Sequence, residues 1–182
     1  LGTIAPTSGH LQVVAGYDAR RGVLLVRDPN TPGTTEFAVE PLLERHASSG
    51  PLCMALVPAT EAHRLDGLEL PDAARRDRFY ALQRALVAHD RERAAALLAE
   101  LELDDPEHFV ALRARLSLCA YDADVAGQLG CVDRLLARFP DDEPLRLWRV
   151  GLLGDLGRRD ERLAALRDMS AGRCDPVVWQ RL

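Results

Sequence analysis

The pattern of hydrophobic and polar residues changes character part-way along the chain. From residue 10 to residue 58 the apolar residues form short, valine-rich runs that are typical of β-strands. From about residue 72 onward, alanine, leucine, arginine and glutamate recur at helical spacing. The sequence therefore predicts an α+β fold. A small antiparallel β-sheet or half-barrel over 1–58 is followed by a linker over 59–71 and an all-α domain of helical-hairpin repeats over 72–182.

Two apolar runs within residues 10–29 predict a β-hairpin. A charged segment, residues 18–22, joins them and ends in glycine, which is typical of a turn. If the turn centres on Arg20, Gln12 lies opposite Asp28. Both faces of this hairpin are apolar, so we expect it inside a larger sheet or barrel that covers both faces.

His10 and Asp28 form a candidate catalytic pair at the open end of this hairpin. The same register places them on one face as diagonal neighbours, roughly 7–8 Å apart at the backbone and within reach of a side-chain hydrogen bond. A carboxylate on one imidazole nitrogen leaves the other free to take a proton, which is the orienter–base half of a nucleophilic triad. The alternative is a surface polar pair, in which Asp28 begins a turn before Pro29.

Three further elements are predicted before residue 58. Residues 34–39 alternate polar with apolar and indicate an edge strand. Residues 41–49 indicate a short helix with proline in its first turn, on which His46 is expected to be solvated. Residues 52–57 indicate another buried strand.

The helical region is predicted to form stacked hairpins. Prolines preceded by an acidic residue recur at Pro106, Pro144 and Pro176, at steps of about thirty-five residues, and each begins a helix. Helix pairs of this period stack into a solenoid. In the second pair we expect a longer connection around 121–130. In the third, Arg162 takes the position where a small residue is expected.

The predicted hairpin resembles part of a peptidase family. The sequences GHLQVVAGYD and GVLLVRDP resemble the C-terminal lobe of the bacteriocin-processing, double-glycine cysteine peptidases, which are papain-like, over about residues 1–58. The resemblance implies that His10 is the general base and that Asp28 orients it. In that family the nucleophilic cysteine and the oxyanion-hole glutamine lie on a helical lobe upstream of the histidine. We therefore expect a fragment of a bacterial thiol hydrolase that has no peptidase activity by itself.

The helical region resembles tetratricopeptide repeats over residues 72–182. The first hairpin fits best, with Ala94 at the small position where its second helix packs on the first. The resemblance implies a peptide or protein partner, and arginine-rich inner faces of such solenoids suit acidic segments. Trp148 is expected in the core. The candidate binding residues are Arg75, Arg76, Arg84, Arg113, Arg115 and Arg149.

Composition and charge narrow the classes of function. The formal net charge of −5 argues against a nucleic-acid partner, which binds a basic surface. All 23 basic residues are arginine, as expected of a GC-rich bacterial genome. No apolar run approaches the ~20 residues that span a membrane, and the first ten residues lack the regions of a signal peptide. We expect a cytoplasmic protein without a membrane span.

The cysteines predict neither a metal site nor a cofactor. No two of them have the C-x-x-C spacing of metal ligands, and each lies in an apolar or helical context. We expect buried free thiols, because free cysteine is among the most buried residue types. The four are Cys53, Cys119, Cys131 and Cys174.

Two hypotheses follow, and the sequence leaves open whether the protein is an enzyme. The first is a fragment of a papain-like peptidase whose helical repeats recruit a substrate or partner. The second is a noncatalytic scaffold that binds proteins through its repeats. Papain-like lobes also occur in transglutaminase-like enzymes and acyltransferases, so hydrolysis is implied only by the family likeness.

Overall fold

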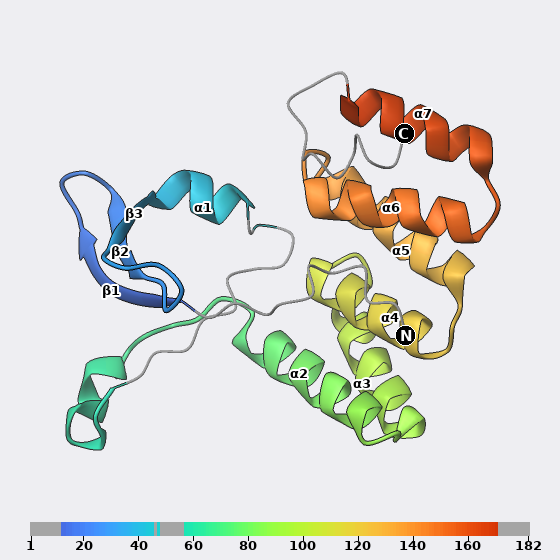
Figure 1. Cartoon of the computed structure of the whole chain (residues 1–182). Helices are drawn as coiled ribbons and strands as arrows, with labels where there is room; N and C mark the ends of the chain where they lie inside the picture. The colour runs from blue at the N-terminus through green and yellow to red at the C-terminus, as the bar shows by residue number, and fades with distance from the viewer. Residues whose placement is uncertain (1–11, 46, 48–56, 171–182) are drawn as a thin grey trace. The chain divides into compact units, whose positions relative to one another are not determined.

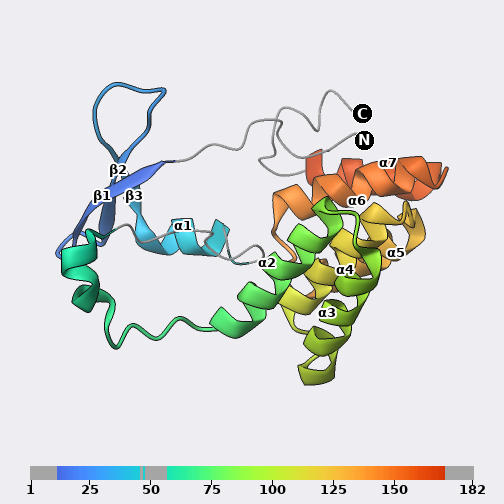
Figure 2. The same ribbon diagram turned by 90° about the horizontal axis from the view of Figure 1, so that it is seen from below.

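The chain consists of a small β-sheet followed by a series of helices, which is an α+β arrangement as predicted. A computed structural model describes residues 12–45, 47 and 57–170 (Figures 1 and 2). The chain divides into two compact units, residues 1–52 and 53–182. We refer to them as the sheet unit and the helical unit, and describe each by itself.

The sheet unit contains a three-stranded antiparallel meander. Strands β1 (Val13–Asp18), β2 (Val23–Arg27) and β3 (Thr35–Ala38) lie in the order β1-β2-β3. Helix α1 (Val39–Arg45) follows β3 directly. The predicted hairpin, edge strand and short helix are therefore all present. The hairpin strands lie within the predicted segment, and the edge strand and the helix each begin within two residues of the predicted start.

Part of the sequence prediction for this unit lies outside the described residues. That part includes His46 and all but the last residue of the strand predicted over 52–57.

The β1–β2 register changes once along the hairpin. Val13 pairs with Arg27, as predicted for a turn centred on Arg20. Gly16 pairs with Leu25, because a bulge at Ala15 adds one residue to β1. Pairs nearer the turn are therefore displaced by one position.

The expectation that both faces of the hairpin are covered is wrong for the described sheet. Val13, Val14 and Tyr17 of β1 are 63%, 58% and 59% exposed, whereas Val26 of β2 is only 3% exposed. Within residues 12–45, three strands and one short helix provide too little protein to cover two faces of a sheet. The buried side of this unit is therefore concentrated on its central strand.

Over residues 57–170, the helical unit contains three helical hairpins, preceded by a 3₁₀-helix. The 3₁₀-helix η1 (Ala59–Leu65) lies in the predicted linker and buries none of its residues. The hairpins are α2 (Ala73–Val87) with α3 (Arg91–Asp104), α4 (Phe109–Tyr121) with α5 (Val125–Arg138), and α6 (Glu143–Asp155) with α7 (Arg159–Ser170).

The hairpins repeat with a period of 34 residues. Helices α3, α5 and α7 begin at Arg91, Val125 and Arg159, each 34 residues after the last. Three residues connect the helices of every hairpin, so the longer connection predicted around 121–130 is wrong. Asp124 caps α5 by accepting a hydrogen bond from the Gly127 amide at 2.8 Å, and the helix begins there despite its glycines.

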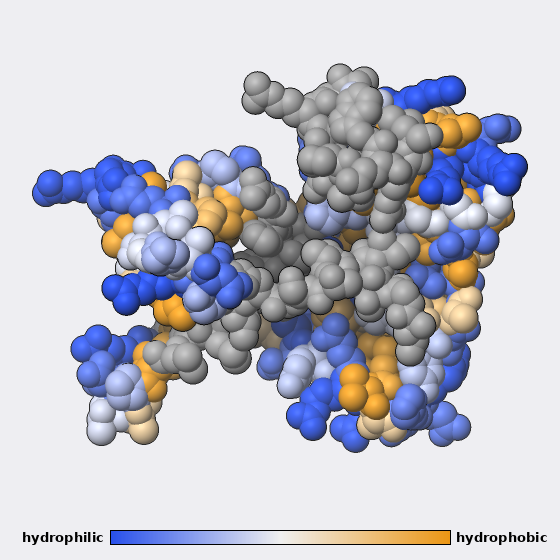
Figure 3. Space-filling view, in the orientation of Figure 1, coloured by the Kyte–Doolittle hydropathy of each residue, from blue (hydrophilic) through white to orange (hydrophobic). Residues whose placement is uncertain are grey.

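The core of the helical unit follows the same period. Leu82, Leu116 and Val150 take the same position in successive hairpins, and none is more than 2% exposed. Helix α5 packs on both α4 and α6, which joins the second hairpin to the third. Trp148 packs against this core, as predicted. Hydrophilic residues cover much of the visible surface, interrupted by small hydrophobic patches (Figure 3).

Candidate functional site

Asp28 is held in place by the turn that follows β2. Its Oδ1 accepts a hydrogen bond from the Asn30 amide at 2.7 Å, and its carbonyl accepts one from the Thr31 amide at 3.2 Å. An aspartate that bonds to the backbone two residues later forms an Asx-turn. The carboxylate is therefore oriented by its own loop.

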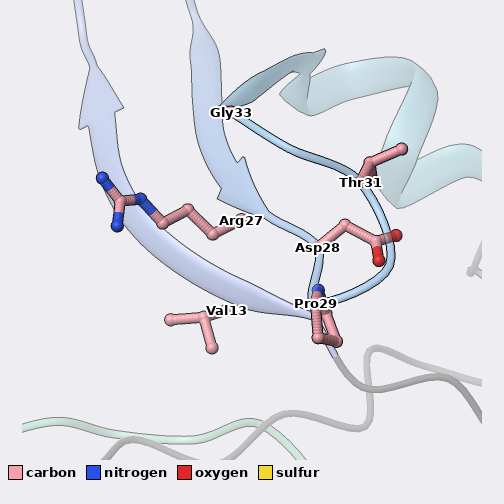
Figure 4. A pocket seen from close by; sticks show the side chains of 6 residues that line it. All are labelled: Val13, Arg27, Asp28, Pro29, Thr31 and Gly33. Atoms are coloured by element: carbon pink, nitrogen blue, oxygen red, sulfur yellow. The ribbon is translucent and has the colours of Figure 1, made fainter.

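The other carboxylate oxygen of Asp28 faces β1. Gln12 Nε2 donates a hydrogen bond to Asp28 Oδ2 at 2.8 Å, which confirms that these residues lie opposite each other. Beside them is an open hollow of about 460 Å³, in which the Arg27 and Asp28 side chains point in opposite directions (Figure 4). It is lined by Val13, Arg27, Asp28, Pro29, Thr31 and Gly33.

The predicted partner of Asp28 is His10, which lies outside the described residues. The catalytic pair His10–Asp28 therefore stays a prediction. What the described residues provide is an oriented carboxylate at the rim of a hollow. Such a group can orient a base, but a nucleophile is still needed for covalent catalysis.

An ion-pair network at the closed end of the hairpin was not predicted. Arg21 Nε bonds Asp18 Oδ2 at 2.8 Å, and its two terminal nitrogens bond the Glu36 carboxylate at 2.8 Å each. The Arg21 guanidinium lowers the pKa of both carboxyl groups. This network ties the β1–β2 turn to β3.

Several of the candidate arginines in the helical unit are occupied by ion pairs with neighbouring carboxylates. Three of the six candidates cross from one helix to another in this way, so they connect elements of the repeat. The pairs are Arg75 with Asp72 and Asp104, Arg115 with Glu102, and Arg149 with Asp133.

Two other candidates differ in exposure. Arg84 is exposed on α2. Arg113 on α4 is partly buried, and this burial lowers the pKa of its guanidinium although the Asp142 carboxylate opposes the shift. The equivalent positions of the neighbouring hairpins carry Phe79 and Leu147. Arg113 thus places a cation where the repeat otherwise has an apolar side chain.

The remaining candidate, Arg76, belongs to a cluster around Phe109. The Arg76 guanidinium carbon lies 5.4 Å from the centre of the Phe109 ring, and that of Arg138 lies 5.8 Å from the same centre. Phe139 meets Phe109 edge-on, with ring centres 6.3 Å apart. Cations at such distances are attracted by the ring. Helix α2, the start of α4 and the end of α5 therefore bring two guanidiniums to one aromatic side chain.

The Asp72 carboxylate, which contacts the neighbouring residue His108, is already engaged. Asp72 lies 3.4 Å from His108 Nε2 and pairs with Arg75. Burial lowers the pKa of His108, so its imidazole is neutral near pH 7, and its Nδ1 accepts the Val110 amide as the cap of α4. Within the described residues, neither Arg76 nor Arg138 forms an ion pair.

This arrangement suits an anion. Two guanidiniums that have no carboxylate partner in the described part of the chain offer charge-assisted hydrogen bonds to a carboxylate or phosphate group. Arg76 was identified from the sequence, whereas Arg138 was not. The sequence around Arg138 indicates only that it is a basic residue in the last turn of a helix, where the helix dipole also favours a cation.

Three other features bear on function. No group of three His, Cys, Asp or Glu side chains that could hold a metal ion occurs in the described part of the chain. In the same part, no helix has the length and apolar character needed to cross a membrane.

Cys119 and Cys131 are free thiols, as predicted, and only Cys131 is fully buried. Cys53 and Cys174 lie outside the described residues.

Comparison with known proteins gives no relative. No family model, curated protein or solved structure matches this chain. The resemblances to a papain-like lobe and to tetratricopeptide repeats therefore stay predictions, and a proposal of function depends on the geometry described above.

Proposed function

We propose that the helical unit is a protein-interaction scaffold that binds an acidic peptide segment of a partner protein. The observation that supports this is the Phe109 cluster, where Arg76 and Arg138 lie against one ring without an ion-pair partner among the described residues. The two arginines come from different hairpins. An acidic segment that contacts both would therefore bridge the first two hairpins.

Because the protein is negatively charged overall, binding of an acidic peptide depends on contacts at the Phe109 cluster. The formal net charge is −5, so the protein as a whole does not attract an anion. Affinity must come from direct contacts with the two guanidiniums. A hydrogen bond to a charged group contributes about 1.5–3 kcal/mol, so losing both is expected to weaken binding by at least about tenfold.

The test is fluorescence anisotropy with a short, fluorescein-labelled polyglutamate peptide. We expect saturable binding that weakens with salt, and at least about tenfold weaker binding when Arg76→Gln and Arg138→Gln are combined. A polyglutamine peptide of the same length is the uncharged control.

A matched variant separates a local site from general charge. Arg159→Gln combined with Arg167→Gln removes the same charge from two exposed positions of α7. This variant is expected to bind polyglutamate like the unmodified chain. Equal loss of affinity in the two double variants would contradict a site at Phe109.

For the sheet unit we propose a papain-like lobe in which Asp28 orients His10. The supporting observation is that the Asp28 carboxylate is fixed by Gln12 and by its own turn at the rim of a hollow. A fixed carboxylate beside an imidazole stabilises the protonated ring, so it raises the pKa of the histidine. On this proposal the parent protein is a thiol hydrolase, and this chain has no peptidase activity by itself.

NMR titration of His10 tests the second proposal. Asp28→Asn is expected to lower the pKa of His10, whereas Glu44→Gln, at an exposed residue of α1, leaves it unchanged. An unchanged pKa of His10 in Asp28→Asn would mean that the two side chains do not interact. The protein-interaction scaffold would then be the only proposal of function left. Thiol-dependent peptide cleavage by the purified chain would contradict the expected inactivity.

A further inference from the structure

Two thiols meet inside the second hairpin, where the proposed function makes no use of them. Cys119 lies near the end of α4, and Cys131 lies on the facing helix α5. The Cys119 sulfur lies against α5 at Gly127, where a Cβ would be 2.8 Å from it, and Cys131 lies on the same face of α5 one turn later. The two side chains therefore meet where α4 packs on α5.

The two sulfurs differ in access. Cys131 is only 3% exposed, whereas Cys119 is partly exposed. A reagent in solution therefore reaches the Cys119 sulfur more readily than the buried Cys131 sulfur.

The surroundings keep both thiols neutral. Burial raises the pKa of both thiols, and that of Cys131 reaches about 11, so both are protonated near pH 7. Arg115, the cation that influences both sulfurs, already pairs with Glu102. Forming a thiolate is therefore costly here, so exchange with a disulfide is expected to be slow near pH 7 and faster as the pH rises.

We propose that Cys119 and Cys131 are an oxidation site at which a small-molecule disulfide converts the two thiols into an intramolecular disulfide. The Cys119 thiolate attacks one sulfur of the reagent, which forms a mixed disulfide and releases one reagent thiolate. The Cys131 thiolate then attacks the Cys119 sulfur, and the second reagent thiolate leaves. The two cysteine protons end on the two released thiols, and the reagent takes the two electrons.

The new bond would fix a connection that also contacts the first hairpin. Residues 122–124 lie between the two cysteines, and Asp122 accepts two hydrogen bonds from Arg91 at 2.7 and 2.6 Å. Tyr121 contacts His89 of the first hairpin at 3.2 Å. Closing a covalent loop around this connection restricts the unfolded chain, so the oxidised protein is expected to have a higher Tm.

Mass spectrometry of the full chain tests the proposal. Cys53→Ser and Cys174→Ser remove the other two thiols, and the protein is treated with glutathione disulfide, denatured and alkylated. We expect a product that is two hydrogens lighter and takes up no alkylating reagent. Cleavage before Asp122 and Asp124 separates the two cysteines, so the linked peptides identify the bond; trypsin has no site between them.

Single variants test the order of the two steps. In Cys131→Ala, glutathione is expected to stay on Cys119, and in Cys119→Ala the buried Cys131 is expected to stay unmodified. Circular dichroism shows whether each variant is folded. The rate should rise about tenfold per pH unit below the pKa of Cys119, because the thiolate attacks.

Two results would overturn the proposal. One is recovery of both cysteines as alkylated thiols after treatment of the folded chain. The other is a mixed disulfide that persists on Cys119 while Cys131 is present.

Discussion

His89 and Ala123 take the same left-handed backbone conformation in successive hairpins. Their φ angles are 60° and 56°, and each is the middle residue of its three-residue connection. The third hairpin has Gly157 at this position, with φ 70°. The left-handed region costs a residue with a Cβ about 1–2 kcal/mol, and glycine avoids this cost. Two of the three connections are therefore strained.

Ala123→Gly is accordingly expected to stabilise the helical unit by about 1 kcal/mol. Urea denaturation followed by circular dichroism measures the change. Ala99→Gly is the matched control, because Ala99 is exposed in the middle of α3 and the same substitution there costs about 1 kcal/mol. Destabilisation by both substitutions would mean that the strain at Ala123 is absent.

Two glycines of α5 are expected to respond in opposite ways to alanine. A Cβ at Gly127 would lie 2.1 Å from Asp124 Oδ2 and 2.8 Å from the Cys119 sulfur, whereas one at Gly130 meets no other atom within 4 Å. Gly127→Ala displaces the cap of α5, so we expect a loss of about 1–3 kcal/mol. Gly130→Ala is expected to gain about 0.5–1 kcal/mol. Thermal denaturation of the two variants measures both, and equal effects would contradict this description of α5.

These glycines also show where sequence reasoning fails. A longer connection was predicted around 121–130, although Gly127 and Gly130, which have a low intrinsic helix propensity, both lie in α5. Asp124 was the better indicator of where α5 begins, because an aspartate that accepts a hydrogen bond from the amide three residues later, here Gly127, is typical of a helix N-cap. The helical hairpins themselves could be predicted, because their apolar positions repeat along the chain.

In the sheet unit, the hairpin and the pairing of Gln12 with Asp28 could be predicted from valine-rich runs and a turn. The bulge at Ala15 could not, because no local signal distinguishes a bulged residue from a paired one. The Phe109 cluster depends on residues that are distant in sequence. Arg76 stood out as a basic residue, whereas the role of Arg138 follows only from the packing of α5 beside α4.

The Arg21 network makes the sheet unit sensitive to acid. Arg21 lowers the pKa of Asp18 and of Glu36 below their ordinary values of 3.8 and 4.5. A lowered pKa in the folded state gives stability that is complete above the unfolded value and is lost as the pH falls through the folded value. We therefore expect the unit to lose stability progressively below about pH 4.5.

Arg21→Gln removes the part of this dependence that comes from the guanidinium, so the variant should be less stable at pH 7 and should change less in acid. Thermal denaturation at several pH values, followed by the NMR signals of the buried Val26 methyl groups, measures the difference. An equal acid response in both proteins would mean that other groups are responsible.

Arg162 occupies the position that Ala94 takes in the first hairpin, and its Nε is buried with no hydrogen-bond partner among the residues that the structure describes. Its guanidinium lies beside Gly154, where a Cβ would be 3.2 Å from Nη1. Methionine keeps most of the apolar stem and removes the unpaired donor, whose burial costs about 1–3 kcal/mol. Arg162→Met is therefore expected to stabilise the helical unit by about 1 kcal/mol in urea denaturation. Arg159→Met, at an exposed residue of the same helix, should change stability by less than about 0.5 kcal/mol. A destabilised Arg162→Met would show that the guanidinium contributes favourable contacts that outweigh its unpaired Nε.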